Sequence, residues 1–195
     1  MDADEPNQRR LWHYVLIAAA VAFGAALVER AMGRVLISKS GHVMLWEGTV
    51  ASPENSQQVF DWYSFSHVIH GIVFYALLRP VARKWDRPLG WCLVAAVAVE
   101  AAWEVFENTP FTIERYRKAT IALDYYGDSV LNSMCDIGCC VVGFALAAKL
   151  PWWGSLAVVV ANELFVGLMI RDNLTLNVIM LIHPFESIRR WQGGG

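Results

Sequence analysis

The chain has 195 residues and a formal net charge of -2, and 56% of its residues are hydrophobic while only 17% are charged. This composition excludes a disordered protein and disfavours an ordinary soluble domain. The small net charge, with no basic stripe interleaved with aromatic residues, excludes nucleic acid as a partner. The length provides material for one small helical bundle, residues 1–195, and for no second domain.

Five apolar segments are long enough to cross a bilayer. They cover residues 11–28, 62–78, 89–106, 129–150 and 154–170. The first would extend about 27 Å as a helix, close to the thickness of the hydrocarbon layer. Arg9 and Arg10 precede it, as in a signal peptide, but no small-residue cleavage site follows it. The sequence therefore predicts an uncleaved anchor and an all-α, polytopic transmembrane bundle.

A shorter apolar segment, residues 174–182, lies near the C-terminus. As a helix it would extend about 14 Å, which is half a crossing. Leu174, Val178 and Leu181 repeat at helical spacing, and Pro184 would kink any longer helix. We therefore expect a short sixth or re-entrant helix that covers the outer mouth of the bundle.

The basic residues of the short segments predict the orientation of the chain in the membrane. Arg9 and Arg10 precede the first span. Four more basic residues crowd the connection between the second and third spans: Arg79, Arg83, Lys84 and Arg87. Two crossings separate these groups, so both are expected on the cytoplasmic side, together with the N-terminus. The segments before residue 62 and between residues 107 and 128 would then lie outside the cytoplasm.

Polar residues occur near the outer end of several predicted spans, although ionisable side chains are costly inside a bilayer and commonly mark a functional site. They are His67 and His70 in the second span, Glu100, Glu104 and Glu107 in the third, and Asp128, Asn132 and Asp136 at the start of the fourth. Within each set the spacing is three or four residues, so each set lies on one face of its helix. We expect these faces to meet inside the bundle.

Two imidazoles with several carboxylates are typical ligands of a divalent metal such as zinc, iron or manganese, which would activate a water molecule. Without a metal, a histidine beside a carboxylate would act as an acid/base pair, or two carboxylates would share a proton. A structural alternative is that the polar groups only join the helices by hydrogen bonds. The sequence leaves these alternatives open.

The residues are assigned to roles as follows. The predicted catalytic residues are His67, His70, Glu104, Asp128 and Asp136, and the hypothetical metal ligands are His67, His70, Glu104 and Asp128. The predicted supporting residues are Glu100, Glu107, Asn132 and Ser66. Arg115, Arg117 and Arg171 are predicted to bind an anionic part of the substrate.

The leading hypothesis is a membrane-embedded hydrolase or transferase that acts on a lipid or an envelope precursor in the outer leaflet. A transporter or proton relay would need polar groups from one face to the other, whereas the inner half of the predicted bundle is apolar. A non-enzymatic assembly or scaffold subunit would need only the aromatic and small-residue surfaces. The substrate, the metal and the oligomeric state do not follow from the sequence.

Four strings carry a family resemblance: DWYSFSHVIHGIVFY, EAAWEVFENTPFTIERYR, YYGDSVLNSMCDI and RDNLTLNVIMLI. Together they resemble an uncharacterised family of small alphaproteobacterial inner-membrane proteins, catalogued as a domain of unknown function. The resemblance covers nearly the whole chain and implies a multi-pass protein of the bacterial inner membrane, without a reaction. EAAWEVFE followed by GDSVLNSMCD is also similar, more weakly, to the VanZ-like membrane proteins.

Overall fold

The computed structural model describes residues 5–121 and 124–193, which form helices and no strand, with one isolated bridge between Trp46 and Phe60. The helices are α1 (Glu5–Ala31), α2 (Ser64–Lys84), α3 (Leu89–Glu107), α4 (Pro110–Ala119), α5 (Val130–Lys149), α6 (Trp152–Ile170), α7 (Leu174–Ile182) and α8 (Glu186–Gln192). Five of these described helices, α1, α2, α3, α5 and α6, are long and apolar enough to cross a membrane. The predicted all-α polytopic bundle is therefore confirmed.

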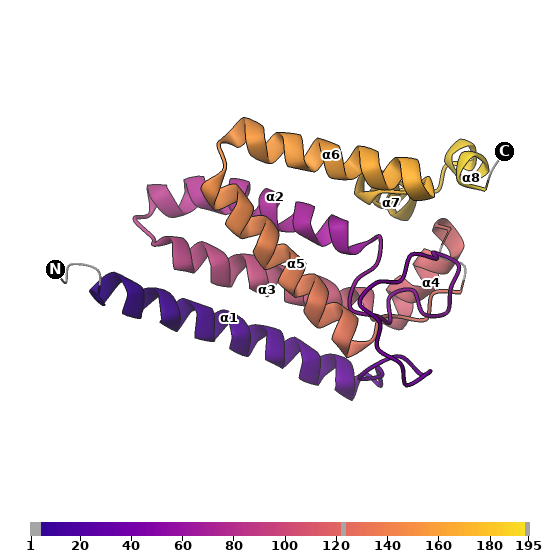
Figure 1. Ribbon diagram of the computed structural model, residues 1–195, viewed down its shortest axis with the longest axis horizontal. Helices are drawn as coiled ribbons and strands as arrows, with labels where there is room; N and C mark the ends of the chain where they lie inside the picture. The colour runs from indigo at the N-terminus through magenta and orange to yellow at the C-terminus, as the bar shows by residue number, and fades with distance from the viewer. Residues whose placement is uncertain (1–4, 122–123, 194–195) are drawn as a thin grey trace.

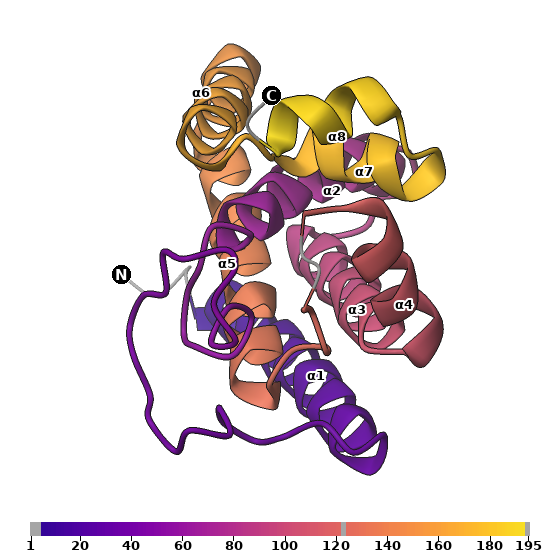
Figure 2. The same ribbon diagram turned by 90° about the vertical axis from the view of Figure 1, so that its right-hand side faces the viewer.

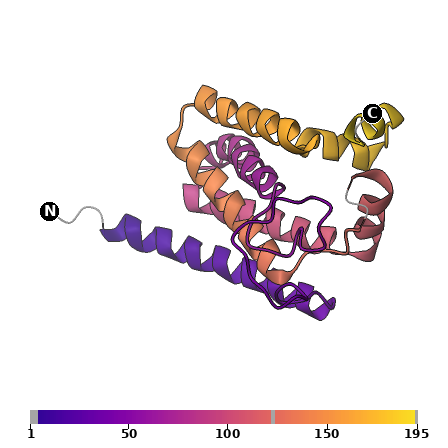
Figure 3. The same cartoon turned by 45° about the vertical axis from the view of Figure 1, so that its right-hand side comes forward.

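The long helices run alongside one another, and the short helices gather at one end of the bundle (Figure 1). We call this end, which carries α4, α7 and α8, the α4 end. The first turns of α1 lie at the opposite end, as a second view also shows (Figure 3). Seen from the α4 end, the segment 32–63 runs beside α5 and α1 (Figure 2). The last turns of α2 and the short connection to α3 lie at the end away from α4 (Figure 1), and together they carry the basic cluster of Arg79, Arg83, Lys84 and Arg87.

The observed helices differ from the predicted segments mainly at their ends. Helix α2 begins at Ser64 and continues past Pro80 to Lys84, although a proline inside a helix removes one main-chain hydrogen bond and crowds the carbonyl four residues before it. Helix α4 was not predicted from hydropathy, since it lies outside the apolar segments. Thr109 caps it by accepting a hydrogen bond from the Thr112 N–H, and Pro110 occupies its first turn.

The short apolar segment forms a separate helix at the α4 end. Arg171 adopts a left-handed conformation with φ 56° and ends α6. Asn173 then caps α7, which has nine residues and packs beside α4. The predicted short sixth helix is therefore present.

Two apolar clusters hold the bundle together. One joins α1, α3 and α5 through buried side chains that include Ala25, Ala101 and Ile137. The other lies toward the end away from α4, where Ala82 of α2, Cys92 and Ala96 of α3 and Phe144 of α5 are buried. Small side chains allow these helices to approach closely, as is usual in membrane bundles. The polar residues occupy the space that remains near the α4 end.

Candidate functional site

A single carboxylate from α3 lies between the two histidines of α2. Glu100 is fully buried, and its Oε1 lies 2.5 Å from Nδ1 of His67. Its Oε2 lies 3.1 Å from Nδ1 of His70. A ring nitrogen that carries a proton donates it to such a carboxylate, so Glu100 fixes Nδ1–H on both rings. Nε2 of each ring is then available to accept a proton or to bind a metal.

Two further carboxylates surround His67. Oε1 of Glu104 lies 3.3 Å from Nδ1 of His67, and Oδ2 of Asp136 lies 3.7 Å from Nε2. The Ser64 hydroxyl donates to Oδ1 of Asp136 at 2.9 Å, which orients this carboxylate so that its other oxygen is directed toward His67. All of these carboxylates are buried. The polar faces of α2, α3 and α5 therefore meet inside the bundle, as the sequence predicts.

Asp128 lies just before α5 and is held by side chains from outside the long helices. The Tyr125 hydroxyl lies 3.0 Å from both carboxylate oxygens, and Asn108 donates to Oδ2 through Nδ2 at 3.1 Å. Asn108 also accepts from the main-chain N–H of Asp128 at 2.7 Å. Burial, followed by the neighbouring charge of Glu107, raises the pKa of Asp128 to about 8. Asp128 is therefore a tightly fixed acidic group at the edge of the membrane-spanning region.

The segment just before α2 closes the α4 end over these residues. Gln57 and Gln58 are buried in it, and Gln57 donates to the main-chain oxygen of Gly127 at 2.8 Å. Asn132, predicted to support the site, donates to the main-chain oxygen of Gln58 at 2.9 Å. Asp61 accepts from the N–H groups of Ser56 and Tyr63, and burial raises its pKa. The segment thus supplies part of the polar lining.

A cavity of about 350 Å³ opens beside this cluster. Its polar lining comprises Asn55, Ser56, Tyr63, Ser66, His67, His70, Glu107, Tyr116, Tyr125, Asp128, Asn132, Asp136 and Asn177. Its apolar lining comprises Phe74, Val99, Trp103, Leu174, Val178 and Leu181. Glu100 and Glu104 lie behind the lining, where they contact the histidines. Ser66 is in the wall, whereas Ser64 makes the hydrogen bond to the carboxylate cluster.

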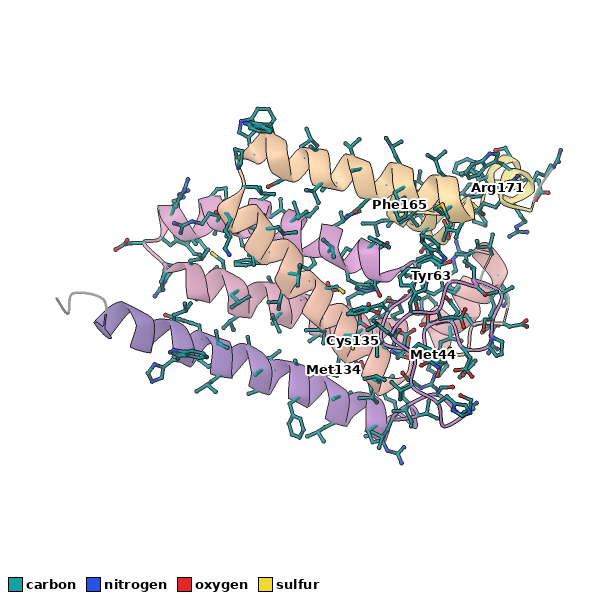
Figure 4. The ribbon with its side chains drawn as sticks, viewed as in Figure 1. Met44, Tyr63, Met134, Cys135, Phe165 and Arg171 are labelled. Atoms are coloured by element: carbon teal, nitrogen blue, oxygen red, sulfur yellow. The ribbon has the colours of Figure 1, made fainter. Side chains whose placement is uncertain are left out.

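The three arginines predicted to bind substrate donate instead to main-chain oxygens. Arg115 donates to Leu181 at 2.8 Å and also to Ile182, which fastens the end of α7 to α4. Arg117 donates to the carbonyl of Tyr125. Arg171 donates to the carbonyl of Trp191 at 3.1 Å and lies just beyond the end of α6 (Figure 4). None of the three arginines is among the described residues that line the cavity, and their role in substrate binding stays a prediction.

The residues that can hold a metal form three overlapping groups within the described part of the chain. In each group one ligand atom per residue lies within 4.8 Å of the others. The groups are His67 with His70 and Glu100, His67 with Glu104 and Asp136, and Glu104 with Glu107 and Asp128. The predicted set of His67, His70, Glu104 and Asp128 is therefore divided among different groups, and Glu100, predicted only as a support, contacts both imidazoles.

Several residues of the site were missed from the sequence. Ser64, Asn108 and Tyr125 orient the carboxylates, and Glu29 at the end of α1 is fully buried beside Ser133. Glu29 carried a signal, because it is an acid at the end of an apolar span. Ser64 lies in the predicted second span, three residues before His67, where a serine commonly bonds back to the main chain of its own helix. Asn108 and Tyr125 lie in polar segments where such residues are ordinary, so no pattern in the sequence singled them out.

The chain is similar to proteins from several alphaproteobacteria. The family model described as "Protein of unknown function (DUF2585)" matches residues 29–194, which include every residue of the site. A UPF0314 protein of Sphingopyxis alaskensis is 50% identical over 180 residues, which are 92% of this chain and 95% of that protein. One of Paracoccus denitrificans is 53% identical over 86% of each chain, and one of Rhizobium meliloti is 46% identical over 98% of this chain and 96% of its own. No solved structure matches. The chain thus belongs to the DUF2585 family.

Proposed function

We propose that this protein is a membrane-embedded hydrolase or transferase that acts on the polar end of a lipid or a lipid-linked envelope precursor. The main support for the proposal is the position of the His70 side chain. Its Nδ1 is held by Glu100, while its ring stacks on Phe74 with centroids 5.8 Å apart and meets Trp103 edge-on at 6.3 Å. A proton-accepting imidazole therefore stands where the polar lining of the cavity meets its apolar lining.

The apolar lining supports an amphiphilic substrate. Val99 of α3 and Val178 of α7 line the cavity and are 49% and 44% exposed, so this lining continues onto the outer surface of the bundle. A membrane would place acyl chains against that surface. The cavity volume of about 350 Å³ is at the lower end of ligand pockets, which suits a head group whose chains remain in the bilayer.

The imidazoles supply the proton transfers that such a reaction needs. Nε2 of His70 removes a proton from water, or from the hydroxyl of an acceptor, as its oxygen attacks the carbonyl or phosphoryl centre of the substrate. The bond to the leaving oxygen then breaks, and the imidazolium returns the proton to that oxygen. Glu100 stabilises the imidazolium and keeps Nδ1 protonated throughout, in the manner of a carboxylate behind a catalytic histidine. In a hydrolase the attacking oxygen belongs to water, and in a transferase it belongs to the hydroxyl of an acceptor molecule.

The proposal includes a location: the bacterial inner membrane, with the N-terminus in the cytoplasm and the site near the periplasmic face. The basic residues at the end of α2 and in its connection to α3 support it, because this part of the chain lies at the end of the bundle away from the site. An alternative, a proton relay across the membrane, is disfavoured by the apolar cluster of Ala82, Cys92, Ala96 and Phe144 in the other half of the bundle.

The proposal is tested by reconstituting the protein in vesicles made from alphaproteobacterial membrane lipid extract and following the lipids by mass spectrometry. Wild-type protein should convert at least one lipid species, and the His67→Ala/His70→Ala variant should not. His42→Ala, which alters an exposed histidine of the segment 32–63, is the matched control and should behave as wild type. Equal lipid profiles with wild type and with the double variant, both folded, would overturn the proposal and favour a scaffold role.

A further inference from the structure

Carboxyl groups outnumber cationic side chains at the site. The site brings together Glu100, Glu104 and Glu107 of α3, Asp136 of α5, and Asp128, which lies just before α5. Among the described residues that line the cavity there is no lysine or arginine, and only His67 and His70 can carry a positive charge. Like charges at such short range repel strongly in a medium of low dielectric constant. The cluster therefore requires either bound protons or bound cations.

Glu104 occupies the centre of the cluster. It is 1% exposed, and its Oε1 accepts no hydrogen bond within the described residues although it lies 3.3 Å from Nδ1 of His67. A buried carboxylate oxygen without a donor is rare and costly, and a metal ion is one of the partners that removes the cost. His67 and Glu104 each belong to two of the three possible metal-binding groups, and Glu104 is the residue that joins the group toward α2 to the group that contains Asp128.

We propose that the site holds two divalent metal ions bridged by the carboxylate of Glu104. The first ion is bound by His67, Glu104 and Asp136, and the second by Glu104, Glu107 and Asp128. This inference rests on the proposed function in placing the ions beside the reaction, but metal binding is measurable without any substrate. Paired ions would activate water and stabilise the charge that develops on the attacked group.

The residues around the ligands are arranged as they are around known metal sites, where each ligand is oriented by a second hydrogen bond. Glu100 engages Nδ1 of His67 and leaves Nε2 toward Asp136. Ser64 engages one oxygen of Asp136 and leaves the other toward His67. The Tyr125 hydroxyl, together with the side-chain amide of Asn108, holds the carboxylate of Asp128.

The donor set indicates which metals the site would take. Carboxylate oxygens predominate, with a single imidazole, and helical bundles use such sets from facing helices for iron and manganese. The cysteines of α5 belong to none of the three groups, so soft thiolate ligation is not part of the site. Manganese is therefore a suitable probe, and its electron paramagnetic resonance spectrum distinguishes an isolated ion from a bridged pair.

The test begins with protein that is purified in detergent, stripped with a chelator, loaded with Mn²⁺ and freed of excess metal. Elemental analysis should find two ions per chain, and the resonance spectrum should show the closely spaced hyperfine lines of an exchange-coupled pair. Glu107→Gln should retain one ion with the six-line spectrum of an isolated Mn²⁺. Glu104→Gln should hold at most one ion and show no coupling, because the bridge is lost.

Two variants serve as controls. Glu114→Gln changes an exposed glutamate of α4 that pairs with Lys118 at the surface, and it should keep both ions and their coupling. His70→Ala should also keep both, which distinguishes the proposed pair from a metal held by His67, His70 and Glu100. Size-exclusion chromatography and circular dichroism establish that each variant is folded. If Glu104→Gln does not fold, wild type and Glu107→Gln still decide the question.

Three results would overturn the proposal: fewer than two ions in the metal-loaded wild type, two ions without coupling, or a coupled pair that persists in Glu104→Gln. None of these three results would reject the proposed function, because His70 and Glu100 would still form an acid/base site without a metal. A coupled pair in a protein that converts no lipid would instead support the metal centre and reject the proposed function.

Discussion

Gly143 of α5 lies directly against the main chain of Val68 on α2. A Cβ atom at Gly143 would stand 1.9 Å from the carbonyl oxygen of Val68, and one at Gly71 would stand 1.9 Å from that of Cys140. Neither position can hold a side chain unless the two helices separate. Because Val68 lies between Ser64 and His70, this crossing sets the distance between the histidines of α2 and Asp136 of α5.

Replacing Gly143 with alanine should therefore destabilise the bundle. We expect a loss of about 1–3 kcal/mol in the free energy of unfolding, as is typical when a packed core is overfilled. Gly138→Ala is the matched control on the same helix, since a Cβ there meets no atom within 4 Å. It should be neutral or slightly stabilising because alanine favours helix. Unfolding in detergent, followed by circular dichroism, measures the free energy of unfolding of both variants. Equal values would contradict the close approach of α2 and α5 at Gly143.

Glu100→Gln should disturb both histidines without unfolding the protein. A carboxylate accepts from both Nδ1–H groups, whereas an amide offers one acceptor oxygen and two donor hydrogens. At least one ring should then change tautomer, which nitrogen-15 resonance of labelled histidines detects. Loss of such an orienting group commonly weakens metal affinity or activity about 10–100-fold. Unchanged histidine resonances in a folded variant would show that Glu100 does not fix the rings.

Asp172 gives the stability of the α6–α7 junction a pH dependence. Burial raises the pKa of Asp172 from the ordinary 3.8 to about 6 in the folded protein. The folded state thus binds the proton more tightly than the unfolded state, and the stabilisation is present below about pH 4 and is lost as the pH rises through about 6. The loss is on the order of 2–3 kcal/mol.

Asp172→Asn, which is neutral at all pH values, should escape that loss. Its advantage over wild type in the free energy of unfolding should increase between pH 4 and pH 7. Asp86→Asn, in the exposed connection between α2 and α3, provides the control and should follow the wild-type curve. Parallel pH curves for wild type and Asp172→Asn would reject this account.

Arg115→Ala should release α7 from α4. The guanidinium donates to the carbonyls of Leu181 and Ile182 at the end of α7, and these hydrogen bonds from a charged group are worth about 1.5–3 kcal/mol each. Hydrogen exchange over residues 174–182 should become faster, while exchange in α5 should not change. Lys118→Ala, which alters an exposed side chain of the same helix, should leave α7 protected. Unchanged exchange in Arg115→Ala would leave substrate binding as the better explanation of this residue.

The proposed orientation is tested with single cysteines at opposite ends of the bundle. A membrane-impermeant thiol reagent added to spheroplasts should label Ala51→Cys, in the exposed part of the segment before α2, and should not label Trp85→Cys, at the end of α2. Both side chains label after the membrane is permeabilised, which confirms their accessibility. The reverse pattern would place the site on the cytoplasmic side.

Much of the fold could be predicted because hydropathy and helical spacing are local properties. The lengths of the apolar segments fixed five membrane-spanning helices, and the nine-residue run predicted α7. The spacing of His67 and His70, of the glutamates of α3 and of the acids near α5 placed each set on one face. The observed ends of α2 differ from the predicted ends by a few residues. The apolar pattern stops where polar residues begin, whereas the helix continues through them.

The pairing of individual residues depended on tertiary structure. That Glu100 joins both histidines, and that Glu104 is shared between two groups of ligands, follows from the rotation and depth of α2, α3 and α5. These are set by the glycine crossing, which is a steric fit between residues distant in sequence. The sequence by itself determined which apolar helices exist and which of their faces are polar, because those depend on neighbours along the chain. Only the packed bundle decided which polar groups meet, because contact distances depend on helices that approach through space.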